Sequence, residues 1–332
     1  MPFDPRRLRH HRCHGAGSRA AGLRARAGAA GRDRPAGRTG LAAAAAAART
    51  GGRAGRRAAV ALRYRCCMQD MQPVGTQLRE WRQRRHMSQL DLAGHAEVST
   101  RHLSFLETGR SLPSREMLLR LADRLEVPLR ERNRLLTAAG YAPMYAERRL
   151  EDPALQVPQQ ALQRVLQAHE PFPALAVDRH WHMVAHNRMV PPLLADLPES
   201  LLRPPLNVLR LSLHPQGLAP RIVNLGRWRE HLLHRLQAQA LRQADPALQA
   251  LVEELRGYPA PPAEHGADAA HDAAVYVPLQ LRTPRGVLSF ISTITVFGAP
   301  NDITLSELAL ETFFPADEAT GQALRELAGT LR

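Results

Sequence analysis

Residues 88–110 read SQLDLAGHAEVSTRHLSFLETGR, and this stretch decides the fold of the first half of the chain. Ser88 and Ser99 each stand directly before a short segment with helical spacing of apolar residues, and Asp91 follows Ser88 by three positions. Serine before the first turn caps a helix, and an acidic residue three positions later completes a variant of the capping box. The stretch therefore predicts two short helices joined by a tight turn.

Three further helices flank this pair. Residues 74–81 carry a narrow apolar stripe at helical spacing, and Ser114 begins a fourth helix. Pro128 begins a fifth helix that runs to Gly140, a natural stop signal. Residues 71–140 are therefore predicted to form an all-α domain of five short helices around a small core.

The second helix of the pair has a face that nothing inside the domain covers. Leu103 and Leu106 share the opposite, apolar face with Val98. An exposed face of this kind can read DNA, because arginine donates two hydrogen bonds to guanine and threonine or phenylalanine packs on a thymine methyl. The alternative is an ordinary solvated helix face. The residues on or near the exposed face are Thr100, Arg101, Ser104 and Phe105.

With its flanking helices, the stretch from Gln89 to Arg110 resembles the lambda-repressor-like helix-turn-helix family, often called XRE regulators. The resemblance implies that Gln89 contacts the DNA backbone and assists base reading, and that the exposed face defined above reads bases. Phe105 stands at a groove-facing position that is often polar in relatives. Phosphate contacts are expected from Ser99, Thr108 and Arg110, which stand at a helix N-terminus or in the loop after the second helix of the pair. The predicted DNA-binding residues are Gln89, Ser99, Thr100, Arg101, Ser104, Phe105, Thr108 and Arg110.

Three other residues in or near this stretch are expected to be structural. Arg82 and Glu107 match a pair that forms an ion pair between helices in the family, and both would otherwise be stranded near the core. Glu97 stands at the turn, where many relatives carry glycine, which adopts a positive φ without a steric penalty. Either Glu97 accepts strain of roughly 1 kcal/mol or the turn differs slightly.

The second half of the chain has a different pattern. Residues 141–158 contain several prolines and predict a linker, after which strands at both ends of residues 159–300 enclose a series of helices. This order predicts an α+β domain with an antiparallel sheet, whose sheet and helix cover are completed by residues 301–332. The predicted strands are 174–177, 181–187, 275–281 and 287–297, and the predicted helices are 159–169, 189–197, 207–213, 225–242 and 246–256.

This half resembles the MmyB-like ligand-binding domain, a PAS-like domain that follows a helix-turn-helix in several bacterial regulators. The segments that carry the resemblance are 176–181 with Asn187, 207–211 with His214 and Pro215, and Trp228. It implies a pocket between sheet and helices for an apolar small molecule, with a fatty acid as the leading class. Such a pocket needs apolar walls and a few polar anchors. The candidate anchors are Asn187, Arg210, His214 and Trp228; alternatively, Asn187 and Arg210 merely cap and pair within the fold.

No residue pattern predicts a metal, a cofactor or catalysis. His180, His182 and His186 share strand parity, but zinc needs three or four convergent ligands and nothing supplies the rest, so an exposed strand face is the prediction. The sequence has no catalytic motif such as a Gly-x-Ser-x-Gly elbow or a phosphate-binding glycine-rich loop. We therefore expect no metal, no cofactor and no enzyme activity.

The positive charge is concentrated in residues 1–67. The chain has a net charge of +14, and this segment alone holds 16 arginines against Asp4 and Asp33, which also gives +14. Residues 1–70, which include all three cysteines, are predicted to be a disordered leader. It is a basic arm that binds phosphates, a transit-peptide-like leader, or upstream sequence translated from a start assigned too early.

These features together predict a cytoplasmic transcription regulator. No apolar run reaches the roughly 18–20 residues that span a bilayer, so no membrane partner is expected. The expected partners are an operator in double-stranded DNA, a second copy of the chain and an apolar effector. The alternative is a DNA-binding protein whose second half is a dimerisation or partner-binding module without a small ligand.

Overall fold

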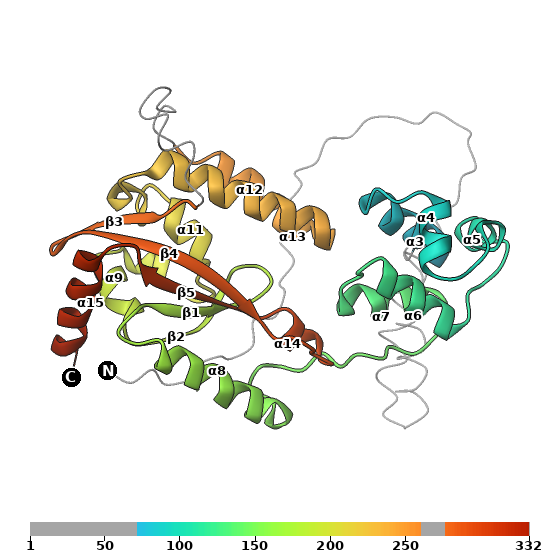
Figure 1. Cartoon of the computed structure of the whole chain (residues 1–332), viewed down its shortest axis with the longest axis horizontal. Coiled ribbons are helices and arrows are strands. Elements are labelled where there is room, and N and C mark those ends of the chain that lie inside the picture. The colour runs from blue at the N-terminus through green and yellow to red at the C-terminus, as the bar shows by residue number, and fades with distance from the viewer. Residues whose placement is uncertain (1–71, 260–275, 332) are drawn as a thin grey trace, which may run out of the picture. The chain divides into compact units, whose positions relative to one another are not determined.

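The computed structural model describes residues 72–259 and 276–331 (Figure 1). The predicted leader and the start of the third predicted strand lie outside these residues. Within the described part of the chain, no helix is both long and apolar enough to cross a membrane.

Five helices form the first domain, as the sequence predicted (Figure 1). Their apolar faces meet in one core, in which the side chains of Leu78, Leu92, Leu103 and Leu106 are fully buried. The last helix ends two residues before Gly140, which has φ +85°. The helices are α3 (Val74–Arg84), α4 (Gln89–His95), α5 (Thr100–Glu107), α6 (Arg115–Arg124) and α7 (Leu129–Ala138).

Serine caps fix the starts of three of these helices. Ser88 accepts a hydrogen bond from the Asp91 amide while the Asp91 carboxylate accepts one from the Ser88 amide, so the predicted capping box is confirmed. Ser99 and Ser114 cap α5 and α6 in the same way, each with the amide three residues later. Each cap satisfies a donor that the first turn of a helix leaves without a partner.

The turn between α4 and α5 has the backbone conformation that glycine would favour. Glu97 adopts φ +55°, in the left-handed region. Its amide bonds to the carbonyl of Gly94, and the Val98 amide bonds to the carbonyl of Ala93. Of the two expectations for this residue, the strained conformation is therefore the one observed.

The second domain contains a five-stranded antiparallel sheet with the order β2-β1-β5-β4-β3. The strands are β1 (Ala174–Val177), β2 (Met183–His186), β3 (Leu279–Thr283), β4 (Gly286–Val296) and β5 (Ala309–Pro315). The helices are η2 (Pro153–Leu155), α8 (Gln156–Ala168), α9 (Val190–Leu194), α10 (Glu199–Leu202), α11 (Val208–Leu213), η3 (Ala219–Arg221), α12 (Leu225–Gln243), α13 (Pro246–Arg256), α14 (Ile303–Ser306) and α15 (Glu318–Thr330). The predicted α+β class is confirmed.

Strand β5 is the one strand of the sheet, among the described residues, that the sequence interpretation did not identify. It lies between β1 and β4 and pairs with both, so the segment expected only to complete the sheet and its cover supplies the central strand. It joins strands from the two ends of the domain. A second difference concerns the strand expected from Trp181: β2 begins at Met183, because Trp181 has φ +67° and ends the turn.

The two faces of the sheet pack against different helices. Side chains of Leu175 and Val177 face a large apolar core that includes α11, α12 and α13. Ala174, Ala176 and Leu310 face the other way and pack against helix α8. All four residues of β1 are buried, because helices cover both of its faces.

Candidate functional site

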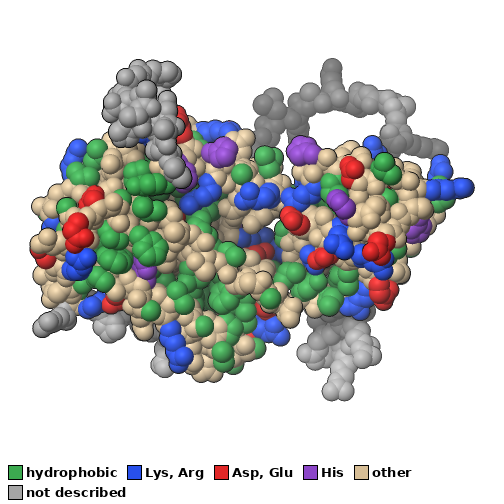
Figure 2. Space-filling view, viewed as in Figure 1, with side chains coloured by type: hydrophobic (Ala, Val, Ile, Leu, Met, Phe, Trp, Pro, Cys, Tyr) green, Lys and Arg blue, Asp and Glu red, His purple; other side chains and the backbone are tan. Residues whose placement is uncertain are grey.

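Helix α5 presents an exposed face beside a fully buried one. Leu103 and Leu106 are 0 % exposed and anchor the helix in the first domain. Thr100 and Arg101 are exposed on the opposite side, and Ser104 is partly exposed. Figure 2 shows that arginine and acidic side chains are mixed over the face of this domain in view.

Phe105 lies between two arginines on this surface. The guanidinium carbons of Arg101 and Arg110 lie 5.5 and 5.7 Å from the centre of its ring. Both distances are within the range of a cation–π contact. The contacts orient two cationic side chains on the exposed surface, where one can face a base edge and the other a phosphate.

Both hydroxyls that are predicted to contact phosphates, those of Ser99 and Thr108, already have local partners. The Ser99 hydroxyl accepts the His102 amide at 3.1 Å, and the Thr108 hydroxyl donates to the carbonyl of Ser104 at 2.7 Å. Both residues are exposed and flank the ends of α5. Their contact with DNA, like that of the other predicted residues, stays a prediction.

The predicted ion pair between helices is present. Arg82 Nε and Nη2 donate to the two oxygens of Glu107 at 2.7 and 2.9 Å, and Gln89 Nε2 donates to Glu107 at 2.8 Å. Burial raises the pKa of the Glu107 carboxyl, but the hydrogen bonds from Arg82 and Gln89 outweigh it, so the pKa is lower than usual. The network ties helices α3, α4 and α5 together and gives Gln89 a structural contact besides its predicted role at DNA.

An apolar pocket lies in the second domain, between helix α12 and the sheet. Its cavity volume is about 80 Å³. Leu175, Met183, Val208 and Leu232 are among the aliphatic side chains of its wall. Its polar contributors are few, as expected of a small-molecule site, and they are Ser212, Trp228, Arg235 and Glu311.

The polar groups of this wall are paired with one another. The indole N–H of Trp228 donates to the Ser212 hydroxyl at 3.0 Å. Arg235 contacts Glu311 at 3.3 Å, and its guanidinium lies 4.5 Å from the ring centre of Trp181. Burial raises the pKa of the Glu311 carboxyl above its usual value, although the charge of Arg235 opposes the shift.

Of the four predicted ligand anchors, Trp228 lines the pocket and the other three lie outside its wall. Asn187 is buried and hydrogen-bonds to the backbone of Ala174, Leu166, Phe172 and Met189. Its contacts show how it stabilises the fold, in line with the alternative interpretation. Its role as an anchor stays a prediction.

Arg210 and His214 lie on the surface next to Tyr258. Arg210 makes two 2.7 Å hydrogen bonds to Glu254, and the Tyr258 hydroxyl donates to the same carboxylate. Burial and the neighbouring Glu254 raise the pKa of Tyr258 to about 12. Arg210 thus pairs within the fold as the alternative interpretation anticipated, and ligand contact by either residue stays a prediction.

Sequence reasoning missed Arg235 and Glu311. Arg235 follows Trp228 by seven residues and Leu232 by three, so the helical repeat places all three on one face of α12. A charged residue on an otherwise apolar helix face is a signal for a buried pair. Its partner Glu311 is 76 residues away in the strand that was not identified, which explains the omission.

The described residues contain one cluster with metal-ligating side chains, Asp178, His180 and His182. The Asp178 carboxylate accepts the amides of His180 and His182 as well as a 3.0 Å contact from the His182 ring. The His180 ring lies 3.0 Å from Asp245. These hydrogen bonds stabilise the turn that leads into β2, and they account for the proximity of the three side chains.

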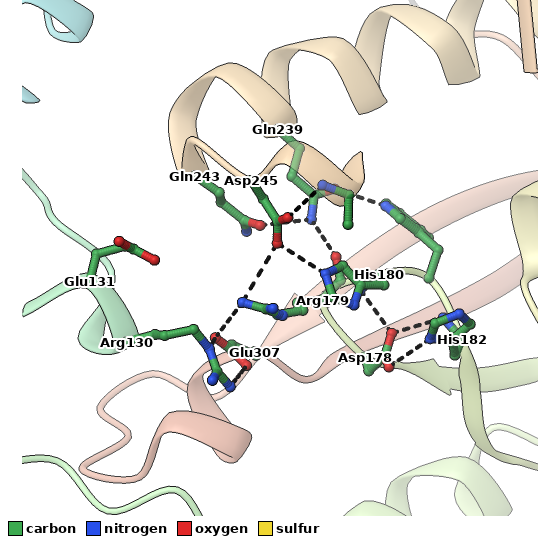
Figure 3. Close-up of polar contacts among 12 residues, drawn as sticks. Arg130, Glu131, Asp178, Arg179, His180, His182, Gln239, Gln243, Asp245 and Glu307 are labelled. Carbon is green, nitrogen blue, oxygen red and sulfur yellow. Dashed lines mark hydrogen bonds and ion pairs between the residues drawn. The ribbon is translucent and has the colours of Figure 1, made fainter. Parts of the chain in front are cut away.

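Polar contacts connect α7 of the first domain with the segment before β5 (Figure 3). Arg130 donates to both oxygens of Glu307 at 2.7 and 2.9 Å and also contacts Glu147. Arg179 lies 3.7 Å from Glu307 and 3.6 Å from Asp245. Glu307 is therefore a shared acceptor for arginines of both domains, two residues before β5 begins.

Two family models match the chain. The model of a helix-turn-helix domain matches residues 73–135, and the model of the MmyB-like transcription regulator ligand binding domain matches residues 158–327, slightly more than half of the chain. A search of curated proteins gave no match. The first match covers α3 to α7, and the second covers the sheet, the apolar pocket and most of α15. The chain therefore belongs to the MmyB-like transcription regulators, with an N-terminal helix-turn-helix DNA-binding domain followed by a ligand-binding domain.

Proposed function

We propose that this regulator reads a specific operator with helix α5 and that its second domain senses an apolar small molecule, with a fatty acid as the leading class. The observation that carries the proposal is the exposed face of α5, where Arg101 stands opposite the fully buried Leu103 and Leu106. An arginine held in this way can donate two hydrogen bonds to a guanine edge in the major groove.

A second copy of the chain completes operator recognition in this proposal. One small helical domain contacts about half of an operator, and a dimer places a second recognition helix one helical turn along the duplex. The operator is therefore expected to consist of two related half-sites. This mode of action places the protein in the cytoplasm, in a non-enzymatic role.

The pocket beneath α12 supports the sensor part of the proposal. Its wall is mainly aliphatic, with Trp228 and a few other polar groups. A ligand changes operator binding only to the extent that it binds the two conformations of the regulator with unequal affinity. Either a repressor or an activator is compatible with this scheme.

Selection of bound duplexes from a random pool tests the DNA-reading function. The full chain is expected to enrich one sequence made of two half-sites about one helical turn apart. Recovery of duplexes without a shared sequence would contradict specific reading.

Mass spectrometry of small molecules released from the purified protein tests the sensor function. An apolar acid that co-purifies with the protein supports the sensor. A stable dimer that releases no such molecule favours a dimerisation or partner-binding module.

A further inference from the structure

Two cavities lie end to end between helix α12 and the sheet. The inner cavity is the apolar pocket described above, with a volume of about 80 Å³. The outer cavity has a volume of about 310 Å³ and is lined by Trp181, Ile294, Val296 and residues near the C-terminal end of α12. Figure 1 shows α12 and the strands of the sheet.

The sheet register and the helical repeat show that both cavities belong to one groove. Leu175 and Val177, which share a face of β1, line the inner and the outer cavity respectively. Along α12, Leu232 lines the inner cavity and Gln239 the outer one. Among the described residues that line them, Arg235 alone belongs to both walls.

Arg235 marks the junction of the two cavities, and there it forms a buried ion pair with Glu311 whose hydrogen bonds are long and not bidentate. The side chain of Glu311 is 6 % exposed, and both guanidinium nitrogens of Arg235 reach the same carboxylate oxygen at 3.3 Å. By contrast, the exposed pair of Arg210 and Glu254 forms two 2.7 Å bonds to two oxygens. A bidentate geometry is the stronger arrangement, so Arg235 has room to improve its contacts with another anion.

The inner cavity alone is too small for a typical small-molecule ligand. Pockets for small molecules usually measure about 300–1,000 Å³, and the inner cavity alone is far below this range. The outer cavity, at about 310 Å³, lies at the lower limit of this range, so a ligand of usual size that enters the inner cavity also occupies the outer one. Arg235 lines both cavities, so a ligand that occupies both of them passes its side chain.

We propose that the two cavities form one ligand channel and that Arg235 holds the anionic head group of an amphiphile in place of Glu311. This inference rests on the proposed sensor function and specifies its ligand. The apolar chain fills the inner cavity and passes the junction, and the head group lies in the outer cavity, where Arg235 turns to meet it. Burial raises the pKa of the Glu311 carboxyl, because it penalises the charged form.

The outer cavity has further cationic groups for a larger head group. Arg179 and Arg242 line it together with Arg235. Arg179 lies 3.6 Å from Asp245 and 3.7 Å from Glu307, which are long distances for ion pairs. Figure 3 shows Arg179 between these two carboxylates. A carboxylate and a phosphate ester share the chemistry that Arg235 recognises, and two probes separate them.

Isothermal titration of the full chain with decanoate, decyl phosphate, decanol and decylamine tests the proposal. The wild type is expected to bind at least one of the two anionic probes about tenfold or more tightly than decanol, and decylamine least tightly. The probe with the lower Kd identifies the head group. Arg235→Gln is expected to remove this preference while decanol binding stays within about twofold of wild type.

Two further variants complete the test. Arg256→Gln, an exposed arginine on α13 outside both cavity walls that pairs with Glu253, is the matched control and is expected to keep the preference. Glu311→Gln removes the competing carboxylate with little change of shape, so anionic probes are expected to bind more tightly, by a fewfold. This variant decides the question if Arg235→Gln does not fold.

The possible failures are distinguishable. Binding of all four probes with equal affinity, or an unchanged anion preference in Arg235→Gln, overturns the channel with its arginine anchor and leaves the sensor function standing. Weaker anion binding by Glu311→Gln also overturns it. Binding of none of the probes by the wild type contradicts both this proposal and an amphiphile-sensing function.

Discussion

Glu107 is held by donors from two other helices, Arg82 from α3 and Gln89 from α4. Its side chain is 1 % exposed and that of Arg82 is 11 % exposed. A buried ion pair is weak evidence for net stability, but removing one partner leaves the other charge buried without compensation. The pair is therefore expected to fix how α5 is oriented within the first domain.

Glu107→Gln is expected to destabilise the first domain by about 3 kcal/mol, because Arg82 loses its charged partner while remaining buried. Hydrogen exchange of amides in α3 and α5 measures this change. Glu80→Gln is the matched control, since Glu80 pairs with Arg84 at 3.5 Å on the surface. This substitution is expected to lower the free energy of unfolding by less than about 0.5 kcal/mol. Equal effects of the two variants would contradict the structural role of Glu107.

Because of the same ion pair, the stability of the first domain is expected to depend on pH. Although burial raises it, the net pKa of the Glu107 carboxyl lies below the ordinary value because of its hydrogen bonds to Arg82 and Gln89. Its stabilising contribution is therefore full above the unfolded-state pKa of about 4.3 and is lost as pH falls through the folded-state pKa. The difference in unfolding free energy between wild type and Glu107→Gln, measured by urea titration at several pH values, is expected to be constant above pH 5.5 and to shrink below pH 4. A difference that grows on acidification would contradict this assignment.

Of the two buried ion pairs, the sequence predicted one and not the other. Arg82 and Glu107 lie in a short helical domain whose spacing resembles a known pattern, so their pairing was predicted and is present. Arg235 and Glu311 meet across 76 residues, and their pairing depends on strand β5, which was not identified. A contact between distant segments follows from tertiary packing, which local periodicity does not encode.

At the scale of elements, local chemistry determined what the sequence predicted well. The caps at Ser88, Ser99 and Ser114 act within three residues, and all three were correctly placed. Strand β5 contains Glu311 and ends in Pro315, and its neighbours β1 and β4 lie far away or across a helix in sequence. Its strand character comes from pairing with both neighbours more than from its own alternation.

The strained turn between α4 and α5 yields a prediction for that element. Glu97→Gly is expected to raise the stability of the first domain by up to about 1 kcal/mol, because glycine adopts φ +55° without a steric penalty, partly offset by its greater freedom when unfolded. Thermal unfolding of the variant measures the gain. Glu97→Ala is the control, since alanine keeps the strain and is expected to give no gain; a loss of stability in the glycine variant would contradict a strained turn.

At the scale of the whole molecule, Glu307 connects the ligand-binding domain with the first domain. Arg130 of α7 bonds to both of its oxygens, and Glu307 also lines the outer cavity and precedes β5, whose Glu311 lines the inner one. The segment from Glu307 to Glu311 is thus a physical connection between the ligand channel and the DNA-binding domain. Coupling between two sites requires an element that both of them bias.

Glu307→Gln is expected to reduce this coupling. In the wild type, saturation with the preferred anionic probe is expected to change the Kd for the operator by about fivefold or more, in either direction, and in Glu307→Gln by less than about twofold. Electrophoretic mobility shifts with and without the probe measure both ratios. Glu147→Gln removes the other, exposed partner of Arg130 and serves as control; an equal ratio in wild type and Glu307→Gln would contradict this route.

The central claim concerns the exposed face of α5, and the ratio of Kd values for random duplex and selected operator tests it most directly. Arg101→Ala is expected to lower this ratio by a factor that corresponds to about 1–3 kcal/mol, because it removes a base contact. Arg134→Ala, which removes an exposed arginine of α7, has the same change of charge and is expected to leave the ratio within about twofold of wild type. An unchanged ratio in Arg101→Ala, or an equal loss in both variants, would contradict base reading by α5.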